Sequence, residues 1–287
     1  MQDFDKLWDY SDVPATEVKF RELLAGSSPE RNLSYHIQLL TQTARTYSLR
    51  NKFAEAHELL DTAEALLPAS EEIAHVRYHL ERGRSFNSAG YRDKAKVHFT
   101  RARQIAERLE EDFYLIDAIH MQAIAAQEDP EEAIRLNEEA LALAEWTTHE
   151  RAKGWLGSLY NNLGWSYHDQ KNYEKALDIF QRSLRWREEK KQAPQIFIAK
   201  YSVGRTLRSM GNTEEALRMQ LALWKEAAAI NRPDGYIHEE LGELYLLKND
   251  SAQYPFHFQK AYELLSADSY LQKFEKERLA RIKKLSE

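Results

Sequence analysis

The chain has 287 residues, of which 43% are hydrophobic and 30% charged, and its 40 basic and 46 acidic side chains give a net charge of −6. This balance argues against a nucleic-acid partner, because phosphate binding usually requires a basic excess. The absence of cysteine excludes disulfides and thiolate metal ligands, and no apolar run approaches the roughly 20 residues that cross a bilayer. The first residues show no secretory signal pattern, so we expect a cytoplasmic protein without membrane contact.

Strong helix formers dominate, glycine and proline are scarce, and strand-type alternation is rare, which predicts an all-α chain. Its first part, residues 1–32, contains the acidic aromatic stretch FDKLWDY and then the helix-like run ATEVKFRELLAG. Pro14 stands where a helix start tolerates proline, and Gly26 stands where a helix ends. We expect this segment to cap the apolar face of the structure that follows.

The clearest internal unit is LYNNLGWSYHDQKNYEKALDIFQRSL, at residues 159–184. Apolar and small side chains recur three or four residues apart before and after the polar turn DQKN, which predicts two amphipathic helices joined as a hairpin. The side chains that carry this pattern are Tyr160, Leu163, Gly164, Tyr167, Ala176, Phe180 and Ser183.

This unit resembles the tetratricopeptide repeat, with Ser183 in place of the usual last alanine. Its small first-helix residue recurs about every 40 residues, whereas the common repeat has about 34. The third repeat has a shortened turn, and the sixth is weaker because Tyr254 replaces the expected alanine. The resemblance covers residues 33–267 and implies a right-handed α-solenoid of about six hairpins, of the long-repeat bacterial type without assigned activity. The six small residues are Ala44, Gly83, Ala123, Gly164, Gly204 and Gly242.

The tail, residues 268–287, has apolar side chains at helical spacing and several basic ones. We expect a single closing helix with a solvated basic face. A dimer contact or a contact with a membrane surface is the alternative for this face.

Motifs for catalysis, cofactors and metals are missing. There is no glycine-rich phosphate loop, no G-x-S-x-G elbow and no HExxH. His75 and His79 share a helix face, but two ligands are too few for a zinc site, and His79 falls at an aromatic position of its repeat. We therefore expect no metal, no cofactor and no enzyme activity.

The resemblance implies that the first helix of each hairpin lines a concave groove. Arginines give this groove basic character in repeats one, two and five, whereas Glu239, Glu240 and Glu243 make repeat six acidic. Such polarity would orient an extended peptide that is acidic in part. The residues predicted to contact a partner are Arg45, Arg77, Arg84, Asn161, Asn162, Trp165, Tyr201, Arg205 and Arg208.

The predicted function is a scaffold or adaptor that binds a protein or peptide in this groove. A peptide-responsive sensor module that acts through a partner protein is a second reading, and an enzyme is a third that rests only on the stock of His and Glu side chains. The sequence leaves open the identity of the partner, the oligomeric state, and whether the chain's own termini occupy the groove.

Overall fold

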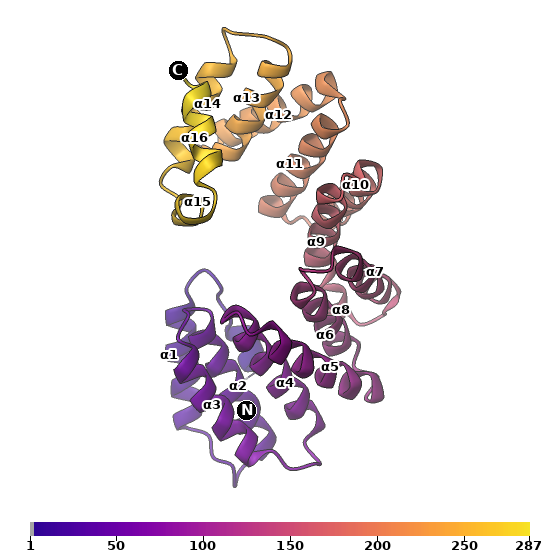
Figure 1. Ribbon diagram of the computed structural model, residues 1–287. Helices are drawn as coiled ribbons and strands as arrows, with labels where there is room; N and C mark the ends of the chain where they lie inside the picture. The colour runs from indigo at the N-terminus through magenta and orange to yellow at the C-terminus, as the bar shows by residue number, and fades with distance from the viewer. Residues whose placement is uncertain (1–2) are drawn as a thin grey trace. The chain divides into compact units, whose positions relative to one another are not determined.

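The computed structural model describes residues 3–287, and all the regular structure in that range is helical (Figure 1). The chain divides into two compact units, Met1–Leu159 and Tyr160–Glu287, which we call the N-terminal unit and the C-terminal unit. The boundary falls inside one helix, α9. Each unit is described by itself below.

The N-terminal unit begins with a short 3-10 helix and a capping helix, followed by three helical hairpins. The hairpins pair α2 with α3, α4 with α5 and α6 with α7, and α8 is a single turn that packs on the last of them. The elements are η1 (Phe4–Leu7), α1 (Val13–Ala25), α2 (Leu33–Ser48), α3 (Phe53–Leu66), α4 (Glu72–Ser88), α5 (Arg92–Arg108), α6 (Asp112–Ala125), α7 (Pro130–Trp146) and α8 (Glu150–Lys153).

The C-terminal unit contains three further hairpins, α9 with α10, α11 with α12 and α13 with α14, closed by two short helices. The elements are α9 (Leu156–Asp169), α10 (Tyr173–Glu189), α11 (Ala193–Ser209), α12 (Thr213–Ala229), α13 (Gly235–Leu247), α14 (Tyr254–Leu265), α15 (Ser269–Phe274) and α16 (Lys276–Leu285).

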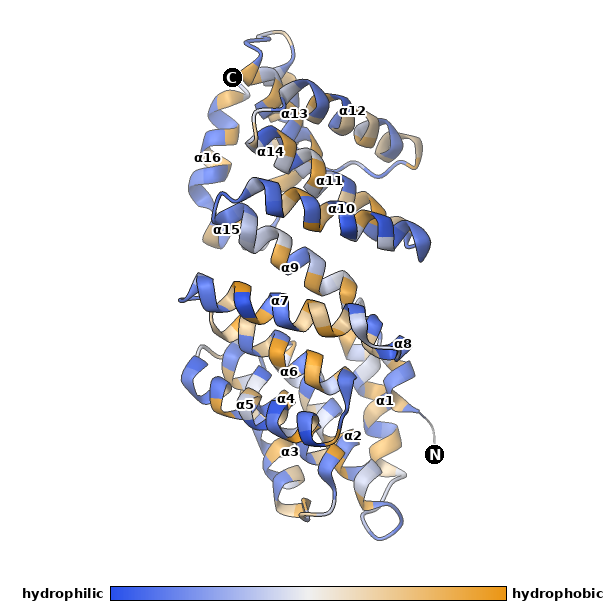
Figure 2. Ribbon diagram, turned by 90° about the vertical axis from the view of Figure 1, so that its right-hand side faces the viewer, coloured by the Kyte–Doolittle hydropathy of each residue, from blue (hydrophilic) through white to orange (hydrophobic). Residues whose placement is uncertain are grey.

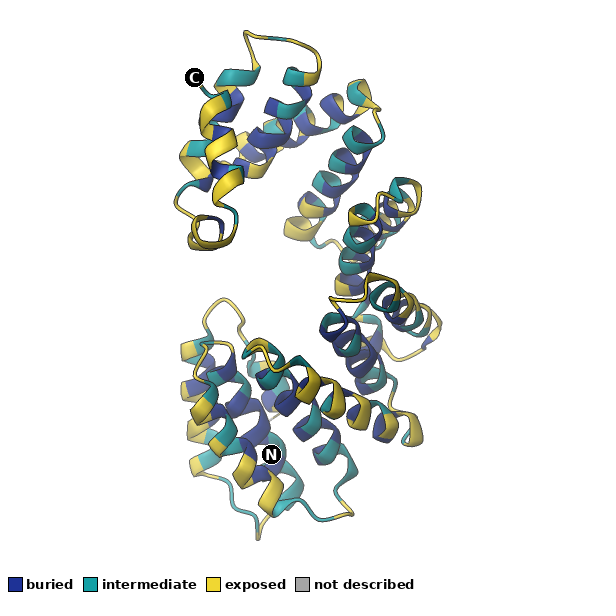
Figure 3. Cartoon of the chain, in the orientation of Figure 1, coloured by how far each residue is buried: buried dark blue, intermediate teal, exposed yellow. Residues whose placement is uncertain are grey.

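In the four hairpins whose small first-helix residue is glycine, that glycine faces a large second-helix side chain. A Cβ placed on Gly83 would lie 2.5 Å from the ring of Phe99, which is fully buried. The same contact recurs in hairpin four, between Gly164 and Phe180. The predicted frame of small residues is therefore confirmed as the packing frame of the hairpins. Buried residues lie on the helix sides that face other helices (Figure 3), and most helices combine hydrophobic and hydrophilic residues (Figure 2).

The turn inside each hairpin has its own recurring feature. Seven residues after the small marker, five of the six hairpins have a residue with positive φ. The third hairpin has Pro130 there, at the start of α7, which agrees with the shortened turn predicted for it. Asparagine and glycine tolerate this left-handed backbone, whereas other residues are strained by it. The five residues are Asn51, Gly90, Lys171, Gly211 and Asn249.

Lys171 is therefore the strained member of this set, at φ 58°. We expect Lys171→Asn to raise the free energy of unfolding by about 0.5 kcal/mol, because asparagine adopts the left-handed conformation at lower cost than lysine. Urea denaturation measures the change. Gln170→Asn, one residue earlier and without positive φ, is the control and should leave stability unchanged. An equal gain from both would show that side-chain polarity, and not backbone conformation, is responsible.

The two ends of the chain are folded onto the hairpins. The predicted first helix is confirmed as α1, with Asp12 as its N-cap and Gly26 as its C-cap. Its Phe20 is buried with Leu39 of α2. The tail forms two helices rather than the single one expected, because α15 ends at Phe274 and α16 begins at Lys276. The predicted division at residues 32 and 267 stays a prediction.

Candidate functional site

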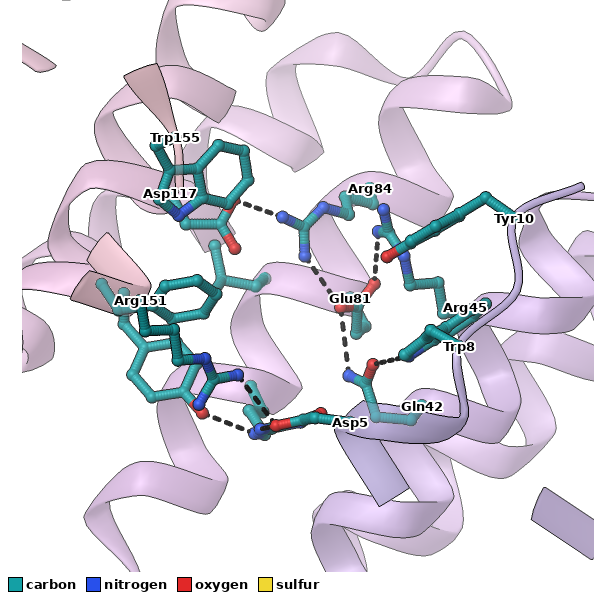
Figure 4. A pocket seen from close by; sticks show the side chains of 14 residues that line it. Asp5, Trp8, Tyr10, Gln42, Arg45, Glu81, Arg84, Asp117, Arg151 and Trp155 are labelled. Carbon is teal, nitrogen blue, oxygen red and sulfur yellow. Dashed lines mark hydrogen bonds and ion pairs between the residues drawn. The ribbon is translucent and has the colours of Figure 1, made fainter. Parts of the chain in front are cut away.

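Each unit has a pocket lined by first helices of its hairpins. The N-terminal pocket, of about 290 Å³, is lined by α2, α4 and α6, by the segment Phe4–Tyr10, and by Arg151 and Trp155 (Figure 4). The C-terminal pocket, of about 470 Å³, is lined by α11, α13 and α16 and by Trp165 of α9. Residues on these inner faces repeat at the same distances from the small markers, which is why successive helices contribute to one surface.

Glu81 of α4 anchors the charges in the N-terminal pocket. It is buried and accepts hydrogen bonds from Arg45 Nη1 at 3.0 Å, Arg84 Nη1 at 2.7 Å and Gln42 Nε2 at 3.3 Å. Burial would raise the pKa of Glu81, but the charges of Arg84 and Arg45 hold it below its usual value. Arg84 also pairs with Asp117 of α6. The guanidinium groups of Arg45 and Arg84 are thus balanced by carboxylates of the hairpins themselves.

Arg77 is different, because its carboxylate comes from the start of the chain. It is 5% exposed, and its Nε donates to the Tyr114 hydroxyl at 2.7 Å. Both of its terminal nitrogens donate to the carboxylate of Asp5, with Nη1–Oδ1 at 2.9 Å. Arg151 Nη2 donates to the same carboxylate at 2.8 Å. Burial would raise the pKa of Asp5, but Arg77 and Arg151 outweigh burial and lower it.

Two aromatic rings of the same segment complete this wall of the pocket. Trp8 stacks on Tyr10 with ring centroids 4.8 Å apart, and its Nε1 donates to Gln42 Oε1 at 3.0 Å. The guanidinium carbon of Arg45 lies 5.9 Å from the centroid of each ring, within the range of a cation–π interaction. These residues belong to the segment 1–32 that was expected to cap the first repeat, and the structure places Asp5, Trp8 and Tyr10 in the wall of the pocket.

The C-terminal pocket has a similar alternation of charge. Glu240 is buried and is paired with Arg205 and Arg208, at 3.0 and 2.7 Å. Burial raises the pKa of Glu240 to about 7, against the pull of Arg208. Arg278 of α16 binds Glu239 through two hydrogen bonds of 2.8 and 2.6 Å.

Arg281 of α16 pairs with Glu243, the third acidic residue of this pocket. The basic face of the tail, expected to be solvated, is therefore partly engaged in ion pairs with α13. That expectation is corrected for Arg278 and Arg281, although the side chain of Arg281 keeps 51% exposure. Attraction between the acidic inner face of the sixth hairpin and the basic tail explains the difference.

The nine predicted contact residues are divided by these pockets. Arg45, Arg77 and Arg84 line the N-terminal pocket. Neither Asn161 nor Asn162 lines one of the two pockets, and their side-chain amides lie 3.4 Å apart on α9. Their role in partner binding, like that of the other seven, stays a prediction. The members that line the C-terminal pocket are Trp165, Tyr201, Arg205 and Arg208.

Asp5, Trp8, Tyr10 and Arg151 were not predicted. One sequence signal was available for the ion pairs between hairpins, since opposite charges recur about one repeat apart on the first helices. Arg45 with Glu81 and Arg205 with Glu240 are examples. No periodic signal points to Asp5, because it lies outside the repeats.

Comparison with known proteins identifies the same repeat. Residues 155–221 match the sequence model of the tetratricopeptide repeat. No curated protein matches the chain. No catalytic family is indicated, and the fold is one that typically serves as a protein-interaction scaffold.

Several solved structures share the fold at low sequence identity. The apo form of RapI has 11% identity and a TM-score of 0.74, with 97% of this chain and 83% of that chain covered. A signal-transduction ATPase with a tetratricopeptide repeat sensor, from Pyrococcus horikoshii, has 15% identity and a TM-score of 0.74. The match covers 96% of this chain but only 43% of that one. A tetratricopeptide repeat protein from Parabacteroides merdae has 16% identity and a TM-score of 0.54, with 99% and 96% covered.

Two further observations concern residues 3–287. None of the helices described there is both long and apolar enough to cross a membrane. In the same range, no three His, Asp or Glu side chains are grouped as metal ligands would be. The match at residues 155–221 identifies a tetratricopeptide repeat there, and the packing frame of the hairpins and these solved structures show that the rest of the chain has the same helical-hairpin fold.

Proposed function

We propose that the chain is a scaffold that binds a peptide segment of a partner protein in its C-terminal pocket. The observation that carries this proposal is the convergence of aromatic and arginine side chains from α9, α11, α13 and α16 on one pocket of about 470 Å³. Tryptophan, tyrosine and arginine are the residues that contribute most to protein–protein binding energies.

The charges of this pocket favour an acidic segment. Four arginines and three glutamates line it, so the pocket carries one positive charge when all are ionised. The side chains of Arg205 and Arg281 are 29% and 51% exposed, so both are accessible to a ligand. A carboxylate of the ligand can pair with Arg205. Glu240 then keeps an ion pair, because Arg208 remains in contact with Glu240. Tyr201 and Tyr236, with ring centroids 6.5 Å apart, supply an apolar contact beside these charges.

The test is selection of peptides from a display library on the wild-type chain, followed by affinity measurement with the selected sequences. We expect acidic peptides, and we expect Arg205→Gln to weaken their binding at least about tenfold, as for loss of a charge-assisted hydrogen bond. Arg218→Gln is the matched control, because Arg218 lies on the second helix α12 with a side chain that is 77% exposed. Equal affinities for wild type and Arg205→Gln would refute the assignment of this pocket. Arg84→Glu is unsuitable, because it would gather carboxylates around Glu81 and disturb folding.

A further inference from the structure

The segment Phe4–Tyr10 lies against the first helices at the positions where this architecture is expected to contact partners. Asp5, Trp8 and Tyr10 form one wall of the N-terminal pocket (Figure 4). The segment reaches α2 through Gln42 and Arg45 and α4 through Arg77. It forms a single 3-10 turn followed by non-helical residues, so its attachment to α2 and α4 rests on side chains.

The buried guanidinium of Arg77 needs a carboxylate partner that the hairpins do not supply, and Asp5 supplies it. Arg77 belongs to α4 and is held in place by the hydroxyl of Tyr114, and its one carboxylate partner among the described residues is Asp5. The pocket's other two buried carboxylates are already engaged by Arg45 and Arg84. A buried guanidinium without a counter-ion is strongly unfavourable. Whatever occupies this position must therefore supply a carboxylate.

The rings on either side of Asp5 define a second requirement. Phe4 packs edge-on against Phe20 and lies 5.2 Å below the guanidinium of Arg77. Trp8 also packs edge-on against Phe20, and its indole N–H finds an acceptor in Gln42. An aromatic residue next to the carboxylate, and a tryptophan three residues after it, therefore each occupy a specific place.

Capping of the first hairpin does not account for these polar contacts. Helix α1 packs on α2 through Phe20 and Leu39, both fully buried. Asp5 and Tyr10 instead turn toward the inner face, where the side chain of Asp5 is 25% exposed and Tyr10 is 62% exposed. A competing segment can reach both places from solvent.

We propose that the N-terminal pocket is a binding site for a peptide segment with the pattern aromatic–acidic–two residues–tryptophan, and that Phe4–Tyr10 is its built-in occupant. A partner with this pattern displaces the chain's own segment and takes over its contacts with Arg77, Arg151 and Gln42. Because the built-in segment acts at a millimolar effective concentration, it suppresses binding of a competitor with the same contacts. The proposal extends the proposed function to a second pocket, and the two can fail separately.

The test uses the full chain and a labelled peptide with the sequence of residues 3–12, DFDKLWDYSD. In the variant Asp5→Asn/Trp8→Ala the built-in segment loses its ion pairs and its tryptophan contacts. We expect fluorescence anisotropy to show that this variant binds the peptide at least about tenfold more tightly than wild type does. Asp3→Asn is the matched control, because Asp3 directly precedes the segment and pairs with the exposed Lys6 rather than with the pocket. It should bind the peptide as weakly as wild type.

Two further measurements keep the proposal falsifiable. A peptide that carries Asp5→Asn and Trp8→Ala should bind neither protein. Adding Arg151→Gln to the protein variant Asp5→Asn/Trp8→Ala, which we call the opened variant, should weaken binding of the unchanged peptide severalfold. Arg151 is suited to this test because its side chain is half-exposed. If the double variant fails to fold by circular dichroism, Trp8→Ala alone takes its place, because it keeps the ion pair between Asp5 and Arg77. Peptide affinity that is equal in wild type and opened variant, or absent in both, overturns the proposal. Arg205→Gln should leave this binding unchanged, which separates it from the C-terminal pocket.

Discussion

Gly83→Leu is expected to lower the free energy of unfolding by about 3 kcal/mol or more, at the upper end of the cost of overpacking a core. A Cβ at this position would lie 2.5 Å from Phe99 Cε1 and 2.7 Å from Cδ1. Phe99 cannot withdraw, because it is fully buried among side chains of α4, α5 and α6. The two helices of the hairpin must then separate, which exposes apolar surface along both. Urea denaturation followed by circular dichroism measures the loss.

The size of Phe99 provides an internal check on this explanation. Phe99→Leu alone should destabilise the hairpin by leaving a cavity, but in the Gly83→Ala background it should recover part of the loss, because the added methyl group then finds room. Gly26→Ala is the control, since a Cβ there meets its nearest atoms at 3.7 Å. Additive effects of the substitutions at positions 83 and 99 would show that the ring contact is not the cause.

This contact explains why the fold could be predicted from the sequence. Close approach of two helices requires a small residue on one of them, and in hairpins two, four and six this residue is a glycine at a fixed distance from a phenylalanine. In hairpin five, Gly204 faces Gln220 at the same distance. Phe180 and Phe258 lie 16 residues after Gly164 and Gly242, as Phe99 does after Gly83. Such a pattern is visible as a period in the sequence because equivalent contacts between helices require similar residues at equal spacing.

The charges of the groove could be predicted in position but not in pairing. Helical periodicity places Arg45, Arg84 and Arg208 on inner faces, as expected. Each of them pairs with a carboxylate of the next hairpin, and Arg84 also pairs with Glu81 of its own helix. Which side chains meet between hairpins depends on the offset between them, which periodicity does not encode. The free basic groove expected from the sequence is therefore replaced by alternating ion pairs such as Arg84–Asp117.

The ends of the chain were the least predictable parts. The acidic aromatic character of residues 4–10 was evident, but a single 3-10 turn has no period that shows where its side chains point. The contact between Asp5 and Arg77 joins residues 72 positions apart, nearly two repeats. Only the three-dimensional arrangement reveals that the segment returns to the inner face.

Two pairs of histidines, each joining the two helices of one hairpin, were also not predicted from the sequence. His79 and His98 lie with their Nδ1 atoms 3.0 Å apart within hairpin two, and His238 and His257 lie 3.1 Å apart within hairpin six. Both pairs occupy the same two places relative to the small marker of their hairpin. His79 was expected to pack in the interior rather than to bind metal, and it does pack against His98 and Tyr78.

Acidification from pH 7 to pH 5 is expected to destabilise the hairpins through these pairs. Burial, followed by the neighbouring imidazole, lowers the pKa of His79 to about 3 and that of His257 to about 4. The folded chain keeps these rings neutral, whereas the unfolded chain binds protons near pH 6.5. The contribution of these neutral rings to the free energy of unfolding is therefore complete above pH 6.5. Below pH 6.5 each ring loses up to about 1.4 kcal/mol of this contribution per pH unit, which amounts to about 2 kcal/mol for His79 at pH 5.

Hairpin one shows which side chains can replace the histidine pair and so remove its titration without disturbing the packing. Its corresponding residues are Leu40 and Leu59, so His79→Leu/His98→Leu should keep the packing and remove the titration. We expect this variant to lose about 2 kcal/mol less than wild type between pH 7 and pH 5, in urea denaturation at each pH. Glu240, whose raised pKa stabilises the fold as pH falls, titrates equally in both chains and cancels in the comparison. Parallel pH profiles would mean that the imidazole pair is protonated as readily in the folded chain as in the unfolded one, and that burial does not control its charge.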